Sequence, residues 1–295
     1  DRRQRQMCIR DSHWNDRMRS EYRAKDDLKL KEKDLKALHS IGITAAHVVP
    51  EKGIFKGKSD LVILDKKSIS ISKDVAQILS FKIGGWGQPY PNSLLGIIAF
   101  MRQSLMDAEW YGKSSAIQKK YPEENESIAL NPALESLEKF RANRLPMLFI
   151  TKEEHGALRA LNITSEFNLN PWILGSGFEY RRLKEIAAYK PFFIFPLEFP
   201  AKPKVTDPHI ALQYSTEQLK HWDMAPDNIK KVYDAGIHFS FTSSPLKKKT
   251  DFRINLQKII DRGLPQDVVL AGLTTFPAKA MGVEKILGKI QPGYI

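Results

Sequence analysis

The sequence predicts an α/β protein built as a (β/α)8 barrel of the TIM type. Short apolar segments alternate with amphipathic ones from residue 146 onward, which is typical of a parallel sheet covered by helices on both sides. The chain has 295 residues, and a barrel of this type takes roughly 250. No internal repeat, low-complexity tract or linker divides the sequence. We therefore expect one α/β domain.

Fewer helices and strands are predicted in the first half of the chain than in the second. Leucines on one side of a charged segment indicate a helix, and β-branched runs indicate strands. The expected elements are a helix over Lys25–Ser40, a strand over Ile43–Val49, a glycine-punctuated loop over Glu51–Asp60, strands over Leu61–Leu64 and Ser68–Ile71, a loop over Gly84–Pro89, and helices over Ser93–Tyr111 and Asn131–Asn143. Asn131 suits the N-cap of the last helix and Pro132 its first position.

From residue 146 the alternation is regular. The expected strands are Pro146–Thr151, Pro171–Leu174, Phe192–Phe195 and Ile237–Thr242. The expected helices are Glu153–Phe167, Phe178–Tyr189, Thr216–Ala235, Asp251–Arg262 and Gln266–Leu273. Because the loops at the carboxyl ends of barrel strands carry the functional residues, any site is expected there.

Composition excludes several classes of protein. The chain is 42% hydrophobic and 27% charged, which excludes disorder as its main state. Its longest apolar run, Leu94–Met101, falls far short of the roughly 18 residues that cross a bilayer, so no membrane span is expected. A single cysteine, Cys8, excludes a disulfide framework and a thiolate metal site. Compartment is left open.

The two ends of the sequence suggest a piece of a longer protein. Residues 1–12 have no apolar period and resemble translated sequencing-adapter read-through, so we expect them to be foreign to the fold. The chain begins at Asp1 with neither an initiator methionine nor a signal-peptide pattern. We therefore assign the predicted barrel to residues 13–285.

Common nucleotide and hydrolase motifs are absent. The sequence contains no phosphate-binding P-loop, and Gly84–Gly87 lacks the spacing of a dinucleotide fingerprint. Gly175-Ser176-Gly177 is not a G-x-S-x-G nucleophile elbow. Loop geometry accounts for both glycine clusters.

The most specific signal lies at the end of the chain. Leu273–Val283 reads LTTFPAKAMGV, and Leu287–Gly293 reads LGKIQPG. Together they resemble the amidohydrolase superfamily, in which a last barrel helix with "LT…PA…G" leads into "G-x-I-x-P-G". Gly42–Ala46 and Ala235–Phe239 resemble two further strand leads of that family, and its imidazolonepropionase-like branch is the most similar. The resemblance implies that residues 286–295 begin the return to a β-sandwich, and that the first strand and the sandwich are missing.

The resemblance also implies one or two divalent metals, usually zinc, at the mouth of the barrel. Such a metal lowers the pKa of a bound water for attack on an amide or imide. The family pattern places H-x-H on the first strand, a histidine after each of two middle strands, and an aspartate after the last. No two of the seven histidines form H-x-H, and the three strand ends that can be checked carry Thr151, Gly175 with Ser176, and Thr242 with Ser243. Neutral hydroxyls are poor zinc ligands, so we expect no metal in this barrel.

A few polar residues remain candidates for a site at the barrel mouth. His47 lies at the carboxyl end of its predicted strand and is either a ligand or substrate contact or a hydrogen-bonded structural residue. Glu153, Glu154 and His155 could bind a metal, yet acidic residues also suit the first turn of a helix. Glu198 faces the mouth if the register holds, and its role is unassigned.

The basic excess suggests a nucleic-acid partner only weakly. The net charge is +12, from 46 Lys and Arg against 34 Asp and Glu. Lys247–Lys249 is one short run, and the other basic residues alternate with acidic ones without interleaved aromatics. We expect a solvated basic surface rather than nucleic-acid binding.

By resemblance, the parent protein is a hydrolase of carbon–nitrogen bonds other than peptide bonds. We expect this barrel itself to be a non-catalytic structural or ligand-binding unit, beside a second amidohydrolase domain in the full-length chain. The alternatives are an active hydrolase with an altered site around His47 and Glu153–His155, and a basic binding module. Substrate and oligomeric state stay open.

Overall fold

The computed structural model describes residues 13–65, 68–83, 90–123 and 128–295. The predictions for residues 1–12, including Cys8, and for the Gly84–Pro89 loop lie outside the described residues. The chain forms two compact units. The first comprises the described parts of Asp1–Leu30, Ala45–Ile150 and Asn162–Pro171, and the second comprises Lys31–Thr44, Thr151–Leu161 and Trp172–Ile295.

The first unit contains strands of two kinds. In one group, β2 (Phe55–Lys58) pairs antiparallel with β5 (Gln77–Ser80), and β5 pairs parallel with β6 (Pro146–Ile150). In the other, β1 (Ala45–Val48), β3 (Asp60–Ile63) and β4 (Ser70–Ser72) form an antiparallel sheet. The segment expected to be a barrel strand around His47 is thus part of an antiparallel sheet.

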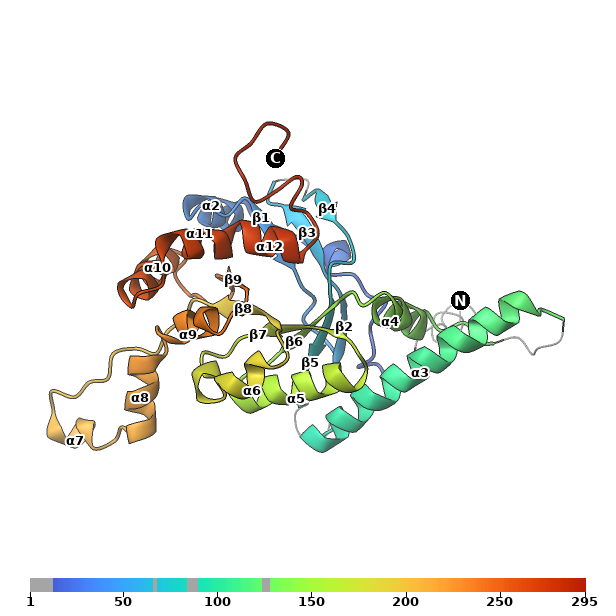
Figure 1. Ribbon diagram of the computed structural model, residues 1–295, viewed down its shortest axis with the longest axis horizontal. Coiled ribbons are helices and arrows are strands. Elements are labelled where there is room, and N and C mark those ends of the chain that lie inside the picture. Colours follow the sequence, from blue (N-terminus) through green and yellow to red (C-terminus); the bar gives the residue numbers. More distant parts are fainter. Residues whose placement is uncertain (1–12, 66–67, 84–89, 124–127) are drawn as a thin grey trace. The chain divides into compact units, whose positions relative to one another are not determined.

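The first unit also contains a short 3-10 turn, η1 (Ala24–Asp27), and two helices that pack against each other (Figure 1). They are α3 (Leu94–Lys120) and α4 (Pro132–Ala142). The Oδ1 atom of Asn131 accepts a hydrogen bond from the backbone N–H of Leu134 at 3.1 Å, which confirms Asn131 as the N-cap of α4. Helix α3 continues nine residues beyond the predicted end at Tyr111.

The second unit has the predicted alternation of parallel strands and helices. Strand β7 (Asn170–Leu174), which begins in the first unit, pairs parallel with β8 (Phe192–Pro196), and β8 with β9 (Phe239–Thr242). The helices are α2 (Glu32–Ser40), α5 (Glu154–Glu166, which ends in the first unit), η2 (Glu179–Arg181), α6 (Leu183–Ala187), α7 (Pro208–Ala211), α8 (Thr216–Met224), α9 (Asn228–Asp234), α10 (Asp251–Asp261), α11 (Gln266–Leu273) and α12 (Thr275–Ala280). The α/β class and the parallel strands are confirmed.

The core of the second unit is aromatic. Phe193, Phe195 and Phe239 are at most 1% exposed, and the rings of Phe193 and Phe195 stack at 5.1 Å. Helices α11 and α12 both pack against β9. Only glycine fits at position 272 of α11, because a Cβ there would lie 2.8 Å from the ring of Phe239.

Several predicted elements differ from the structure. The predicted helix Thr216–Ala235 is two helices, α8 and α9, because Pro226 follows Ala225 and interrupts the backbone pattern. The expected helix Lys25–Ser40 is likewise η1 and α2, with Leu28 in an extended conformation between them. Strands β2 and β5 were not predicted. Gln77 and Ser80 break the apolar run of β5, yet both are buried.

The two motifs at the end of the chain contact each other. Gly288, from LGKIQPG, has φ +91°, and a Cβ there would lie 2.8 Å from Cβ of Ala278 and 2.9 Å from the carbonyl oxygen of Thr274. Thr274 and Ala278 belong to LTTFPAKAMGV. A glycine is required where this segment crosses α12. Beyond it, residues 286–295 contain no strand, and the backbone N–H of Ile295 donates to the carbonyl of Ile286 at 2.9 Å.

Within the part of the chain that the structure describes, every helix is too short or too polar to cross a bilayer.

Gly57 tests the packing that positions β2 in the first unit. It has φ +123°, and a Cβ there would overlap the carbonyl oxygen of Tyr22. We expect Gly57→Ala to lower the free energy of unfolding by at least about 2 kcal/mol in urea denaturation. The control is Gly42→Ala, at φ +91° with nothing within 4 Å of the new methyl group, where only a backbone cost of about 1 kcal/mol is expected. Equal losses would contradict the steric argument.

Candidate functional site

Thr151, the residue that follows β6, lies beside the end of β7 in the second unit. Thr151, 7% exposed, donates its hydroxyl hydrogen to the carbonyl of Leu174 at 2.8 Å. The N–H of Gly175 donates to the carbonyl of Ile194 at 2.9 Å, and a Cβ at Gly175 would lie 2.6 Å from the ring of Phe195. At two of the positions where the sequence resemblance predicts histidine, the residues present are therefore engaged in internal packing and hydrogen bonds.

A buried carboxylate organises the loop after β7. Glu179 is 0% exposed and accepts four hydrogen bonds. The donors are the N–H of Ser176 at 2.6 Å, the hydroxyl of Ser176 at 2.9 Å, the N–H of Gly177 at 3.0 Å and Nδ2 of Asn228 at 2.7 Å. Asn228 also accepts from the N–H of Tyr180 at 2.7 Å. Sequence reasoning missed this cluster, because Glu179 and Asn228 are 49 residues apart.

An aromatic and charged cluster lies beside this loop. The imidazole of His221, on α8, stacks on the ring of Phe178 at 3.7 Å, and the guanidinium of Arg181 lies 4.6 Å from that ring. Arg181 forms ion pairs with Glu154 at 3.5 Å and Glu217 at 2.8 Å. Burial, and then the charge of Arg181, lower the pKa of His221, so its imidazole is neutral at pH 7.

The other residues predicted at this mouth point elsewhere. Glu153 is exposed and pairs with Arg159 at 3.0 Å. His155 and Glu198 are also exposed. Of the acidic and histidine residues at 153–155, only Glu154 is buried, at 6% exposure. The structure thus brings Glu154 into the Arg181 cluster and leaves its two neighbours in solvent.

A lysine side chain binds the backbone just after the end of β9. The Thr242 hydroxyl oxygen accepts from the N–H of Ser244 at 3.1 Å. Ser243, 7% exposed, accepts at its carbonyl from Nζ of Lys249 at 2.5 Å. Burial lowers the pKa of Lys249. One lysine of the basic run therefore binds the protein's own backbone, while Lys247 and Lys248 are exposed.

These strand ends do not fit a zinc ion. The side chains at Thr151, Ser176 and Thr242 are neutral hydroxyls, each engaged in an internal hydrogen bond, whereas zinc prefers imidazole, thiolate and carboxylate. Among the described residues, no group of three or more His, Cys, Asp and Glu is arranged to hold a metal ion.

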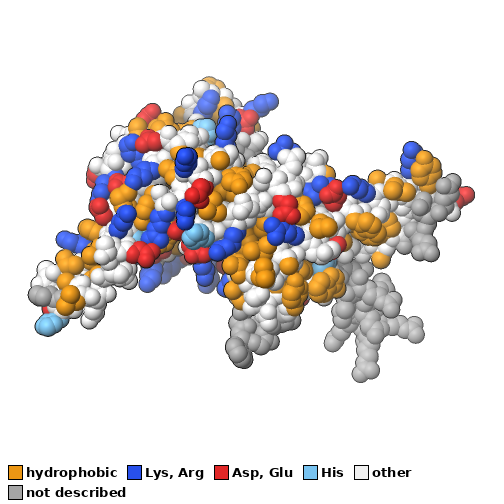
Figure 2. All heavy atoms as spheres, turned by 60° about the horizontal axis from the view of Figure 1, so that its bottom comes forward, with side chains coloured by type: hydrophobic (Ala, Val, Ile, Leu, Met, Phe, Trp, Pro, Cys, Tyr) orange, Lys and Arg blue, Asp and Glu red, His pale blue; other side chains and the backbone are white. Residues whose placement is uncertain are grey.

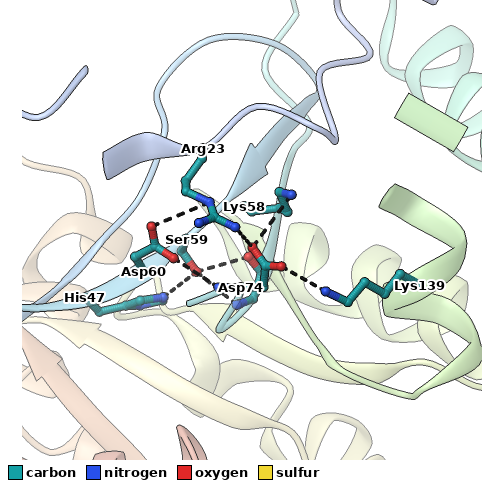
Figure 3. A network of polar contacts seen from close by, with 8 residues as sticks. Arg23, His47, Lys58, Ser59, Asp60, Asp74 and Lys139 are labelled. Atoms are coloured by element: carbon teal, nitrogen blue, oxygen red, sulfur yellow. Dashed lines mark hydrogen bonds and ion pairs between the residues drawn. The ribbon is translucent and has the colours of Figure 1, made fainter. Parts of the chain in front are cut away.

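The first unit holds a separate network around Asp74 (Figure 3). Its carboxylate is contacted by Arg23 at 2.7 Å, Lys139 at 3.0 Å and Lys58 at 3.7 Å, while its N–H donates to Asp60 at 3.0 Å. Burial by itself would raise the pKa of Asp74, but the hydrogen bond from Lys139 and the charges of Lys58 and Arg23 outweigh it and lower this pKa. Three cations on one carboxylate make a structural clamp.

His47 contacts a serine in the same network. Its Nε2 lies 2.6 Å from Oγ of Ser59 (Figure 3), the distance of a nucleophile and its base. Ser59, however, is 0% exposed, and its Oγ also donates to the carbonyl of Ala76 and accepts from the N–H of Ala76, both at 3.0 Å. No substrate can reach this hydroxyl, so the pair supports the structural interpretation of His47.

His47 makes stability depend on pH. Burial lowers its pKa to about 4, below about 6.5 for an unfolded histidine. Between these values the unfolded state binds more protons, so stability from this group falls as pH drops from 6.5 to 4, at up to about 1.4 kcal/mol per pH unit. We expect His47→Gln to flatten this part of the stability–pH curve, measured by urea denaturation. The exposed His209→Gln is the control, and an unchanged slope in His47→Gln would contradict the assignment.

Substitution of Glu179 tests whether its buried carboxylate stabilises the loop after β7. Glu179→Gln turns an amide NH2 toward donors such as the N–H of Gly177 and Nδ2 of Asn228, so we expect the free energy of unfolding to fall by about 3 kcal/mol. Glu185→Gln, which removes only the exposed pair with Arg182, should cost less than about 0.5 kcal/mol. Matching values for the two variants in urea denaturation would show that the buried carboxylate is dispensable.

Comparison with known proteins gives a similarity of fold. No protein-family model matches the sequence, and no curated protein matches it. Among solved structures, an amidohydrolase from Thermotoga maritima MSB8 superposes with a TM-score of 0.76 at 18% identity, covering 95% of this chain and 72% of that one.

Two other similarities are partial. A Xaa-Pro dipeptidase with bound methionine gives a TM-score of 0.38 at 16% identity, over 55% of this chain and 40% of that one. Molinate hydrolase gives 0.35 at 16% identity, over 56% and 39%. At such scores they add no argument. The chain thus shares the fold of an amidohydrolase over nearly its whole length.

Proposed function

We propose that this chain is an amidohydrolase-like barrel that has lost the metal chemistry of the fold and serves as a non-catalytic structural or ligand-binding unit. The observation that supports this proposal is that the polar groups at the strand ends already form hydrogen bonds within the protein. The hydroxyl of Thr151 donates a hydrogen bond to the carbonyl of Leu174, the last residue of β7, and the loop that follows is folded around Glu179. Side chains that would have to bind a metal are instead part of the protein's own hydrogen-bonding scheme.

A non-catalytic barrel is consistent with a second catalytic domain elsewhere in a longer chain. In such a protein the hydrolysis of carbon–nitrogen bonds would belong to that domain. The barrel described by this structure would contribute packing surface or ligand binding. Closure of all its strands into a complete barrel is part of the same proposal.

One observation favours a second function, that of a hydrolase with an altered site. Glu154, Arg181 and His221 come from three connections after parallel strands and lie together, which is where barrel enzymes place their catalytic groups. The imidazole is neutral at pH 7 and could accept a proton. Against this, Arg181 repels a divalent cation, and Glu154 is already paired.

Metal content separates the two functions. We expect the purified full chain, incubated with zinc and desalted, to retain no stoichiometric metal by elemental mass spectrometry, because its strand ends offer hydroxyls already engaged. A zinc enzyme carried through the same column controls for stripping.

Near-stoichiometric zinc that is lost in His47→Ala, Glu154→Gln or His155→Ala would overturn the non-catalytic proposal and identify the ligands. Zinc retained equally by all three variants would overturn it as well, and would place the metal on other residues.

A further inference from the structure

A long connection between β8 and α9 carries α7 and α8 (Figure 1). Leu197 before it and Ala225 after it are buried. From residue 198 to residue 224, none of the side chains that the structure describes is buried. Leu212 is 85% exposed, and Figure 2 shows hydrophobic side chains at the surface of this arm, at the left of the view. Because so little apolar area is removed from water, the segment has low local stability.

The contacts of α8 with its neighbours include two ion pairs and one ring stack. The ion pairs are Glu217–Arg181 at 2.8 Å and Asp223–Arg262 at 3.1 Å. Both carboxylates are more than half exposed, and exposed pairs contribute little to stability. The rings of His221 and Phe178 are nearly parallel, at 14°, with their centroids 3.7 Å apart. Since histidine titrates near neutral pH, the stack is the contact that a moderate change of pH alters.

The surroundings of the imidazole suit its neutral form. The Nδ1 atom of His221 is buried and has no hydrogen-bond partner among the described residues. Protonation of the ring would place an N–H donor there without an acceptor. Phe178 offers an imidazolium a cation–π attraction, but the guanidinium of Arg181 already lies 4.6 Å from that ring.

The charged groups around the imidazole do not compensate for its burial. Glu154 of α5 and Glu217 of α8 attract a proton, whereas Arg181 repels it. The imidazole also lies 6.2 Å from the ring of Tyr180, and Nζ of Lys231 on α9 lies 5.8 Å from that ring. Burial has the largest effect and, together with the charge of Arg181, lowers the imidazole pKa.

Acid therefore favours detachment of α8. In water the imidazole has its ordinary pKa of about 6.5, above its pKa in the docked helix. Between these two values the detached state binds more protons, so the docked fraction falls as the pH falls, by up to about tenfold per pH unit. Helix α8 has nine residues, too few to stay helical in water without tertiary contacts, so detachment also unfolds it.

We propose that residues 198–224 form an acid-released strap, which is docked on the loop after β7 while His221 is neutral and detaches when His221 is protonated. Detachment separates Glu217 from Arg181 and uncovers the ring of Phe178 beside the carboxyl end of β7. The strap depends on no metal and no reaction, so it operates in a non-catalytic barrel and in an active one alike.

Hydrogen–deuterium exchange of the full chain, measured by mass spectrometry, tests this proposal. Exchange rates are divided by the intrinsic rates at each pH to give protection factors. From about pH 7.5 to about pH 5.5 we expect the protection of α8 to fall several-fold, up to about tenfold. His221→Phe retains an aromatic ring on Phe178 and takes up no proton, so its α8 protection should not change with pH. The pH dependence that His47 gives to global unfolding is present in both proteins and cancels in their comparison.

His221→Gln is a second neutral variant, in which α8 should be less protected and equally insensitive to pH. The matched control is His209→Gln, an exposed histidine on the same strap, which should keep the full pH dependence. Protection of α8 that does not change with pH in the wild-type chain would overturn the proposal. A pH dependence that persists in His221→Phe and His221→Gln, or that is abolished by His209→Gln, would overturn it as well.

Discussion

The buried carboxylate of Glu179 determines what the carboxyl end of β7 can do. An ionised group out of water is costly unless hydrogen bonds replace its hydration, and four donors do so here. Those donors come from the same loop and from α9, so the loop cannot open without exposing the carboxylate to an incomplete set of partners. Phe178 and Arg181, on either side of Glu179 in the sequence, are positioned as a consequence. At a strand end built in this way, the polar groups already have their hydrogen-bond partners.

The first unit follows the same principle around Asp74 and His47. Three cations surround one carboxylate, and the serine hydroxyl in contact with His47 is inaccessible to solvent. Each cluster contains residue types that catalyse reactions in other proteins. Their burial and their existing partners are what distinguish a structural network from a site, since a catalytic group has to reach a substrate.

Sequence reasoning predicted the elements that depend on local pattern. Asn131 caps α4 as predicted, and β6, β7 and β8 lie within a residue or two of their expected bounds. Strand β5 was missed because burial of Gln77 and Ser80 depends on neighbours distant in sequence, and the antiparallel pairing of β1 could not be read from its apolar run. At the site, Thr151 and Ser176 were located by their positions after strands. Glu179 and Asn228 were not, because a contact across 49 residues leaves no periodic signal.

The fold and the metal ligands of a barrel respond to different constraints. Gly288 must be a glycine because Ala278 and the carbonyl of Thr274 leave no space for a Cβ, so the motif that joins them is fixed by packing and does not depend on any reaction. Side chains at strand ends that coordinate a metal are satisfied by the bound ion. When no ion is bound, they are buried polar groups that need other hydrogen-bond partners. Thr151 and Ser176 have such partners in this chain. The fold shared with an amidohydrolase can therefore be present in a chain whose strand ends are occupied by internal hydrogen bonds.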